Sequence, residues 1–147
     1  MGDFAYPVVL DPAAEGGFVV SFPDIPEAIT QGEDEAEALA RARDALETAL
    51  EFYVEEGQAL PRPSRPKRGQ RVVEPPAIAS MKLAVYAAMS EGRVRKTDLA
   101  RRLGWHLMQV DRLLDLHHAS RVEQIEAALG AMNRRLAIRV DKQPESA

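Results

Sequence analysis

The stretch Gly16-Gly17-Phe18-Val19-Val20-Ser21-Phe22-Pro23-Asp24-Ile25-Pro26 decides the fold of the N-terminal half of the chain. Its middle, residues 18–22, is rich in β-branched and aromatic side chains and predicts a strand. The glycines before it accept the positive φ of a tight turn, so the apolar residues 6–10 should pair with this strand as an antiparallel hairpin. Residues 23–26 should end the strand, and residues 28–31 predict a brief third strand.

A long helix is expected next, over residues 34–56. Asp34 and Glu37 have the form of a capping box, and Gly57 is a natural stop after the last turn. Apolar residues recur at spacings of three and four, which predicts a stripe that covers one face of the sheet. The stripe consists of Leu39, Ala42, Leu46, Ala49, Leu50 and Tyr53.

A proline-rich linker divides the chain. Three prolines fall within residues 61–66, which forbids a helix there and favours an extended path. The apolar piece that follows, residues 71–76, predicts a short edge strand ended by two prolines. We place the boundary between about residues 70 and 77, so that one domain covers residues 1–73, with the linker from about 61, and the other covers 77–147.

The net charge of −4 over 147 residues conceals a division at the same place. Residues 1–60 hold 14 acidic and 2 basic side chains, a sum of −12, and residues 61–147 hold 9 acidic and 17 basic, a sum of +8. Such asymmetry suggests that the first domain faces a basic protein and the second a polyanion, although a chance difference between two solvated surfaces is the alternative.

The second domain is predicted to be helical. Apolar spacing marks a helix from Ile78 to near Gly92, and a second one opens near Thr97, whose hydroxyl can cap it. A third should start at His106 or Leu107 and run to about residue 116. Ser120 with Glu123 predicts a further capping box and helix, and residues 136–140 alternate like a strand.

The strongest local signal is a helix-turn-helix pattern over residues 96–115. Ala100 is small where the second helix would cross, Gly104 permits the turn, and the apolar residues between them supply a shared core. We therefore predict that the second helix enters a DNA major groove, with a helical hairpin lacking any DNA role as the alternative. The candidate DNA contacts are Lys96, Thr97, Arg101, Arg102, His106, Met108, Gln109, Arg112 and Arg121, of which Gln109 and Arg112 suit base edges.

Composition excludes several other classes of function. There are no cysteines, which removes disulfide scaffolds, Cys-ligated zinc, iron–sulfur clusters and thiol nucleophiles. The three histidines lack metal-binding spacing, and phosphate-binding and nucleophile motifs are missing from the sequence. Asp11, Glu15 and Asp24 at strand ends could bind magnesium as in a nuclease, but turn formation explains them more simply. We expect no enzyme, no cofactor, no membrane span and no secretory signal.

The N-terminal residues resemble the HicB antitoxin family. The resemblance rests on residues 6–9, on residues 17–26 quoted above, and on Thr30-Gln31-Gly32-Glu33 followed by an alanine-rich helix. The resemblance covers nearly the whole chain. Members of this family often carry a C-terminal helix-turn-helix domain, which is the pattern found over residues 96–115.

This resemblance implies an α+β fold, with a partial ribonuclease H-like ββ(β)α(β) unit that has no working active site and an all-α helix-turn-helix DNA-binding domain. It implies a cytoplasmic protein that covers a HicA-type, mRNA-cleaving toxin, binds operator DNA and forms a homodimer or homotetramer. The candidate toxin contacts are Asp11, Glu15, Phe22, Pro23 and Asp24. The alternative is a stand-alone transcription regulator whose acidic domain senses a ligand or dimerises.

Overall fold

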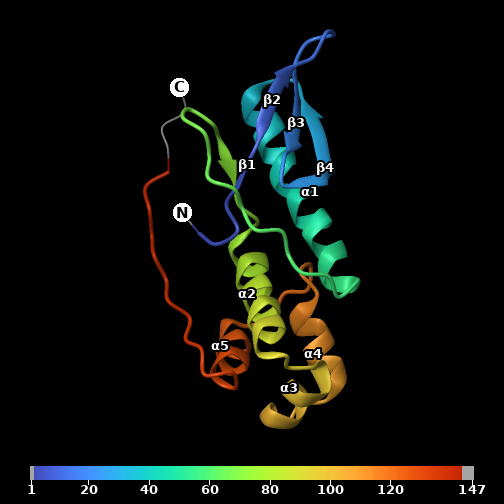
Figure 1. The fold of residues 1–147 in the computed structure, drawn as a ribbon, viewed down its shortest axis with the longest axis vertical. Coiled ribbons are helices and arrows are strands. Elements are labelled where there is room, and N and C mark those ends of the chain that lie inside the picture. The colour runs from blue at the N-terminus through green and yellow to red at the C-terminus, as the bar shows by residue number, and fades with distance from the viewer. Residues whose placement is uncertain (1, 144–147) are drawn as a thin grey trace.

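The computed structural model describes residues 2–143 and is a mixed α+β structure. A small sheet backed by one long helix lies at one end and three short helices lie at the other, and the helix Ala77–Gly92 runs from the middle of the molecule to those three (Figure 1). No helix among the described residues is long and apolar enough to cross a membrane. The elements are β1 (Tyr6–Pro7), β2 (Val9–Pro12), β3 (Phe18–Phe22), β4 (Ile25–Gly32), α1 (Glu35–Glu55), β5 (Val72–Val73), α2 (Ala77–Gly92), α3 (Lys96–Leu103), α4 (Leu107–Leu114) and α5 (Val122–Gly130).

The main sheet has the order β2-β3-β4, with both pairs antiparallel. The predicted hairpin and the strand at residues 18–22 are confirmed. The third strand is longer than the predicted 28–31, because Pro26 lies in an edge strand, where a missing N–H is tolerated.

The prediction of one strand over residues 6–10 is wrong. The chain changes partner at Val8, whose N–H donates to the carbonyl of Arg71 at 3.0 Å. As a result β1 pairs with β5 in a separate two-stranded sheet, whereas β2 continues through Asp11 and Pro12 beside β3. The short strand expected within residues 71–76 is therefore present as β5, and its partner is the start of the chain.

Helix α1 begins and ends as its sequence predicts. Asp34 Oδ1 accepts from the N–H of Glu37 at 2.8 Å, and Gly57 has a φ of 67° just beyond the last turn. The N–H of Gln58 then donates to the carbonyl of Tyr53 at 2.8 Å, the pattern of a Schellman stop. The buried face of the helix, which includes Leu46 and other members of the predicted stripe, packs on β3 and β4.

Two apolar cores meet along α2. The first joins the strands and α1 and includes Ala79 and Leu83 from the first half of α2. The second joins α3, α4 and α5 and includes Val85 and Met89 from the second half. One continuous helix thus contributes to both cores, and the two ends of the molecule are attached through it.

Three predicted features of the C-terminal half are wrong. Thr97 lies inside α3 rather than at its start, since Arg95 is the N-cap and its N–H donates to Asp98 Oδ2 at 3.0 Å. Ser120 and Glu123 form no capping box, because the N-cap of α5 is Arg121, one residue later, and Ser120 Oγ is held by Lys82. Residues 136–140 form no strand in the described chain, because no neighbouring strand lies there to pair with them.

Candidate functional site

Helices α3 and α4 form a compact pair joined by a tight turn. Gly104 takes a φ of 68° at the turn, and the N–H of Trp105 donates to the carbonyl of Ala100 at 2.9 Å. Leu99 and Val110 are fully buried between the helices. The small and apolar positions of residues 99–113 therefore do what their pattern predicts, which is to hold α4 against α3 at a fixed angle.

One face of α4 is exposed and carries both apolar and polar side chains. Met108 is 61% exposed, and the guanidinium of Arg112, one turn later, lies 3.4 Å from its sulfur. His106 occupies the N-cap, and its N–H donates to Gln109 Oε1 at 2.8 Å. The amide of Gln109 is thus used for capping, whereas Met108 and Arg112 project from the helix and are free to reach a ligand.

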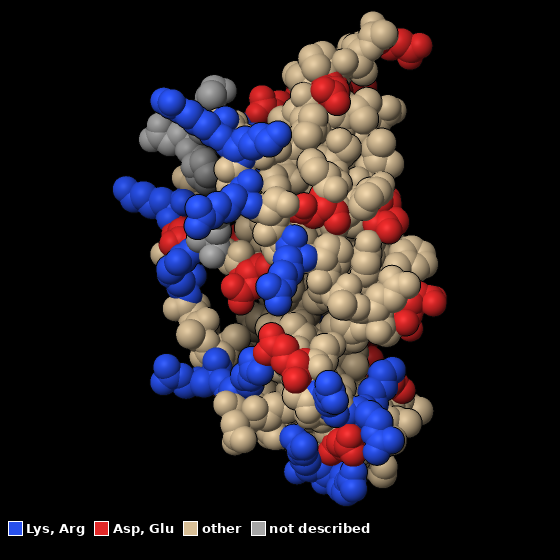
Figure 2. All heavy atoms as spheres, in the orientation of Figure 1, with Lys and Arg blue, Asp and Glu red and all other residues tan. Residues whose placement is uncertain are grey.

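Cations surround this face. Lys96 and Arg101 are held by Asp111 and Asp98 at 2.8 and 2.6 Å. Figure 2 shows Lys and Arg gathered at the end of the molecule where α3 and α4 lie. The N–H of Arg95 and its neighbouring guanidinium groups lower the pKa of Asp98, which stays ionised and positions the arginines. Arg102 donates to the carbonyl of Ala131, and the exposed Arg121 caps α5.

The predicted toxin contacts do not form one cluster. Asp11 and Glu15 are exposed towards the β2–β3 turn, whereas Pro23 and Asp24 lie at the other end of β3. Asp24 is engaged by the linker, because its carboxylate accepts from the N–H and the hydroxyl of Ser64 at 2.8 and 2.5 Å. Phe22 is 1% exposed and belongs to the first core, so that it presents no surface to a partner in this structure.

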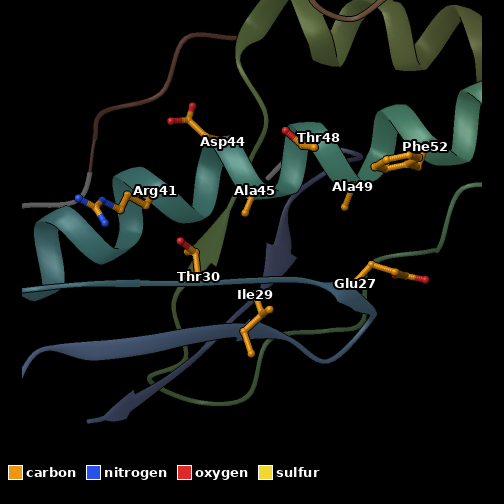
Figure 3. Close-up of a pocket in the computed structure, with 9 residues that line it drawn as sticks. All are labelled: Glu27, Ile29, Thr30, Arg41, Asp44, Ala45, Thr48, Ala49 and Phe52. Atoms are coloured by element: carbon orange, nitrogen blue, oxygen red, sulfur yellow. The ribbon is translucent and has the colours of Figure 1, made fainter. Parts of the chain in front are cut away.

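A groove of about 430 Å³ lies between α1 and the edge strand β4, and no pattern in the sequence predicted it. Figure 3 shows Thr30 pointing from β4 towards α1, and Ile29 pointing away from the helix. Ile29 and Phe52 are 63% and 59% exposed, although both are large and apolar. The sequence signal for this groove was Phe52, a large apolar residue of α1 that lies outside the apolar stripe predicted for that helix. The groove is lined by Glu27, Ile29, Thr30, Arg41, Asp44, Ala45, Thr48, Ala49 and Phe52.

The loop after α4 is fastened to both α1 and α2. Lys82 is fully buried in α2, and its ammonium donates to the carbonyls of Arg112 and Asp115 at 3.0 and 2.7 Å and to Ser120 Oγ at 2.9 Å. Burial lowers the pKa of Lys82. Leu116, at the start of the loop, inserts into the first core. The C-terminal end of α4 is therefore anchored to the part of the molecule that contains the sheet.

His117 adds polar contacts between the loop after α4 and helix α1. Its Nδ1 lies 2.9 Å from Glu47 Oε1 and its Nε2 lies 2.6 Å from Glu51 Oε2, both on α1. His117 and His118 occupy the loop predicted for them. Within residues 2–143, no three His, Asp or Glu side chains are grouped so that they could hold a metal ion.

Comparison with known proteins gives consistent matches. Residues 5–84 match the sequence profile of a family described as HicB-like antitoxins of bacterial toxin-antitoxin systems. A protein of Escherichia coli K12 named Antitoxin HicB is 41% identical over 133 residues, which cover 90% of this chain and 96% of the relative. Antitoxin HicB 1 of Photorhabdus laumondii is 38% identical, covering 92% and 86%, and Antitoxin HicB of Pseudomonas fluorescens is 36% identical, covering 95% and 97%.

Proposed function

Since the chain belongs to the HicB family of antitoxins, whose members are not enzymes, we propose that it neutralises a HicA-type, mRNA-cleaving toxin and represses its own operon. In this proposal the N-terminal domain, a partial ribonuclease H-like unit, binds the toxin. The C-terminal domain binds operator DNA through α3 and α4, which act as a helix-turn-helix. The protein works in the cytoplasm.

The observation that carries the antitoxin proposal is full-length similarity to proteins named Antitoxin HicB, over 90% of this chain. The charge distribution supports it, because a toxin that grips RNA needs a basic surface for the phosphates. Residues 1–60 carry a net charge of −12, which attracts such a surface and competes with RNA for it.

The exposed face of α4 supports the operator proposal. Arg112 and Met108 project from a helix that α3 holds in place, and Arg is the side chain that best reads guanine in the major groove. Further side chains flank this helix, and we propose that they hold phosphates, which adds affinity without sequence information. They are Lys96, Thr97, Arg101, Arg102 and Arg121. Two copies of such a helix, in a homodimer or homotetramer, would read a palindromic operator.

Co-expression tests the antitoxin proposal. The small basic protein encoded beside this chain should arrest growth when expressed alone, and co-expression of this chain should restore growth and yield a complex that co-purifies. The measured mass of that complex gives its stoichiometry. A neighbouring protein that is neither toxic nor bound would refute the antitoxin proposal, and a chain that still bound its operator would then be a stand-alone regulator.

A binding assay tests the operator proposal separately. The chain should bind DNA from upstream of its own operon more tightly than random DNA of the same length, at a fixed salt concentration. Equal affinity for the two DNA fragments would refute sequence-specific repression and leave the antitoxin proposal intact.

A further inference from the structure

The main sheet has one face that the rest of the described chain leaves uncovered. The register places Leu10, Val20 and Thr30 in one cross-strand row, and Val20 is fully buried against α1. Because side chains alternate between faces along a strand, the neighbouring rows point the other way. Those outward rows are Val9, Ser21 and Ile29, and Asp11, Val19 and Gln31.

This outer face carries apolar and polar side chains side by side, with Val9, Val19 and Ile29 among Ser21, Asp11 and Gln31. Val9 and Val19 are half-buried and Ile29 is 63% exposed, and these three side chains belong to neither apolar core. Helix α1 packs on this sheet, and it covers the opposite face. The result is a small sheet on whose outer face apolar side chains reach solvent, Ile29 most of all, as at surfaces that bind another protein.

The edge of the sheet beside this patch is open. β4 is eight residues long and pairs with β3 on one side, and no strand within residues 2–143 lies on its other side. Long edge strands are usually protected by charges or proline, and β4 has both only near its start, at Pro26 and Glu27, so that residues 28–32 carry neither. Helix α1 contacts this edge through Arg41, whose Nη1 donates to the carbonyl of Gln31 at 3.5 Å. Unpaired backbone groups of this kind accept an added strand from a partner.

The open edge joins the sheet face to the groove beside α1. Ile29 lies on the outer face and also lines the groove, whose far wall carries Phe52. The groove carries two carboxylates, Glu27 and Asp44, and one cation, Arg41, whose guanidinium lies 3.1 Å from Glu37 Oε1. A further carboxylate, Asp11, lies on the outer face at the opposite edge strand, β2. A partner that fits here presents an apolar, extended segment within a basic surface.

We infer that the outer face of β2-β3-β4, with the β4 edge and its groove, is the surface that binds the toxin. The inference rests on the proposed function and gives that function a location. Charge decides between the possible occupants: a basic toxin is attracted to the net charge of −12 on residues 1–60, or −7 on the whole of residues 1–73, whereas a second copy of the same domain is repelled by it.

The test replaces exposed apolar residues by lysine. Ile29→Lys and Phe52→Lys place a positive charge on the proposed surface, and Ile138→Lys makes the same change at an exposed apolar residue of the C-terminal segment. The first two variants should weaken binding to the purified toxin by about tenfold or more, as expected for a central interface residue, and Ile138→Lys should bind it normally. All three side chains are exposed, so thermal unfolding should remain close to that of the unmodified chain.

Other outcomes would overturn the inference. Normal toxin affinity of Ile29→Lys and Phe52→Lys, with the unmodified chain binding, would place the toxin elsewhere and leave the proposed function standing. If Ile29→Lys broke a homo-oligomer of the free antitoxin and left toxin affinity unchanged, the surface would bind a second copy. Failure of the unmodified chain to bind toxin at all would refute the proposed function and this inference together.

Discussion

His117 Nε2 lies 2.6 Å from Glu51 Oε2, and this contact joins the loop after α4 to helix α1 of the N-terminal half. The other ring nitrogen of His117, Nδ1, lies 2.9 Å from Glu47 Oε1, so the ring bridges two carboxylates of α1. With Leu116 buried beside it, the contact links the helix proposed to read DNA to the helix that backs the proposed toxin surface.

Removal of the His117 ring should loosen this junction. The ring is 54% exposed, so His117→Ala should lower the free energy of unfolding by about 0.5–1 kcal/mol, the scale of a partly exposed ion pair. His118→Ala is the matched control, because His118 is an exposed neighbour in the same loop. Urea unfolding of both variants measures the difference, and equal stabilities would show that the contact contributes nothing.

The stability contribution of Glu51 should depend on pH. Burial raises the pKa of Glu51 above its usual 4.5 and outweighs the opposing effect of His117. The folded state therefore holds the Glu51 proton more tightly than the unfolded state does. The protonated carboxyl stabilises the folded state at low pH, and this stabilisation is lost as pH rises through the raised pKa of Glu51. Glu51→Gln should thus gain stability relative to the unmodified chain as pH rises from about 4 to about 7. Melting temperatures across that range test the sign, and Glu126→Gln, at an exposed position on α5, is the control.

The buried ammonium of Lys82 should be needed to hold α4. Lys82→Met keeps the apolar stem but leaves the carbonyls of Arg112 and Asp115 without this donor, which should destabilise the fold by about 1–3 kcal/mol. Lys142→Met is the control, since Lys142 is exposed. Chemical denaturation gives the stability, and a Lys82→Met variant as stable as the control would mean that water replaces the ammonium without loss.

Arg112 should matter for DNA and not for the toxin. Arg112→Ala should weaken operator binding by about 1–3 kcal/mol if the guanidinium contacts a base. Arg43→Ala removes an exposed arginine from α1 and should leave operator affinity nearly unchanged. Fluorescence anisotropy with labelled operator measures both. Loss of toxin neutralisation in Arg112→Ala would contradict the assignment of the two activities to different surfaces.

Two glycine-to-alanine changes should have opposite signs. A Cβ on Gly32 would lie 2.4 Å from the backbone N of Ala38, where the end of β4 meets the start of α1. Gly32→Ala should therefore destabilise the fold by about 1–3 kcal/mol or more. A Cβ on Gly130, at the end of α5, meets nothing within 4 Å, and Gly130→Ala should be neutral or stabilising by up to about 1 kcal/mol. Thermal unfolding separates the two, and a stable Gly32→Ala would show that the approach of strand to helix can widen.

Local signals predicted most of the elements. The ends of α1 follow from Asp34 and Gly57, because capping is a contact between residues a few positions apart. The turn between α3 and α4 follows from Gly104 in the same way. Where the prediction failed, a distant residue decided the outcome: Arg71 diverts the first strand at Val8, and Lys82 takes the hydroxyl of Ser120.

The sequence by itself determined the hairpin, the long capped helix, the small and apolar positions that pack α4 on α3, and the division of charge at the proline-rich linker. Only the tertiary structure decided that Phe22 is buried while Ile29 and Phe52 are exposed around an open edge, and that His117 meets Glu51. The reason is physical. Caps, turns and periodicity depend on neighbours along the chain, whereas burial and ion pairing depend on which elements pack together, which local residue types do not encode.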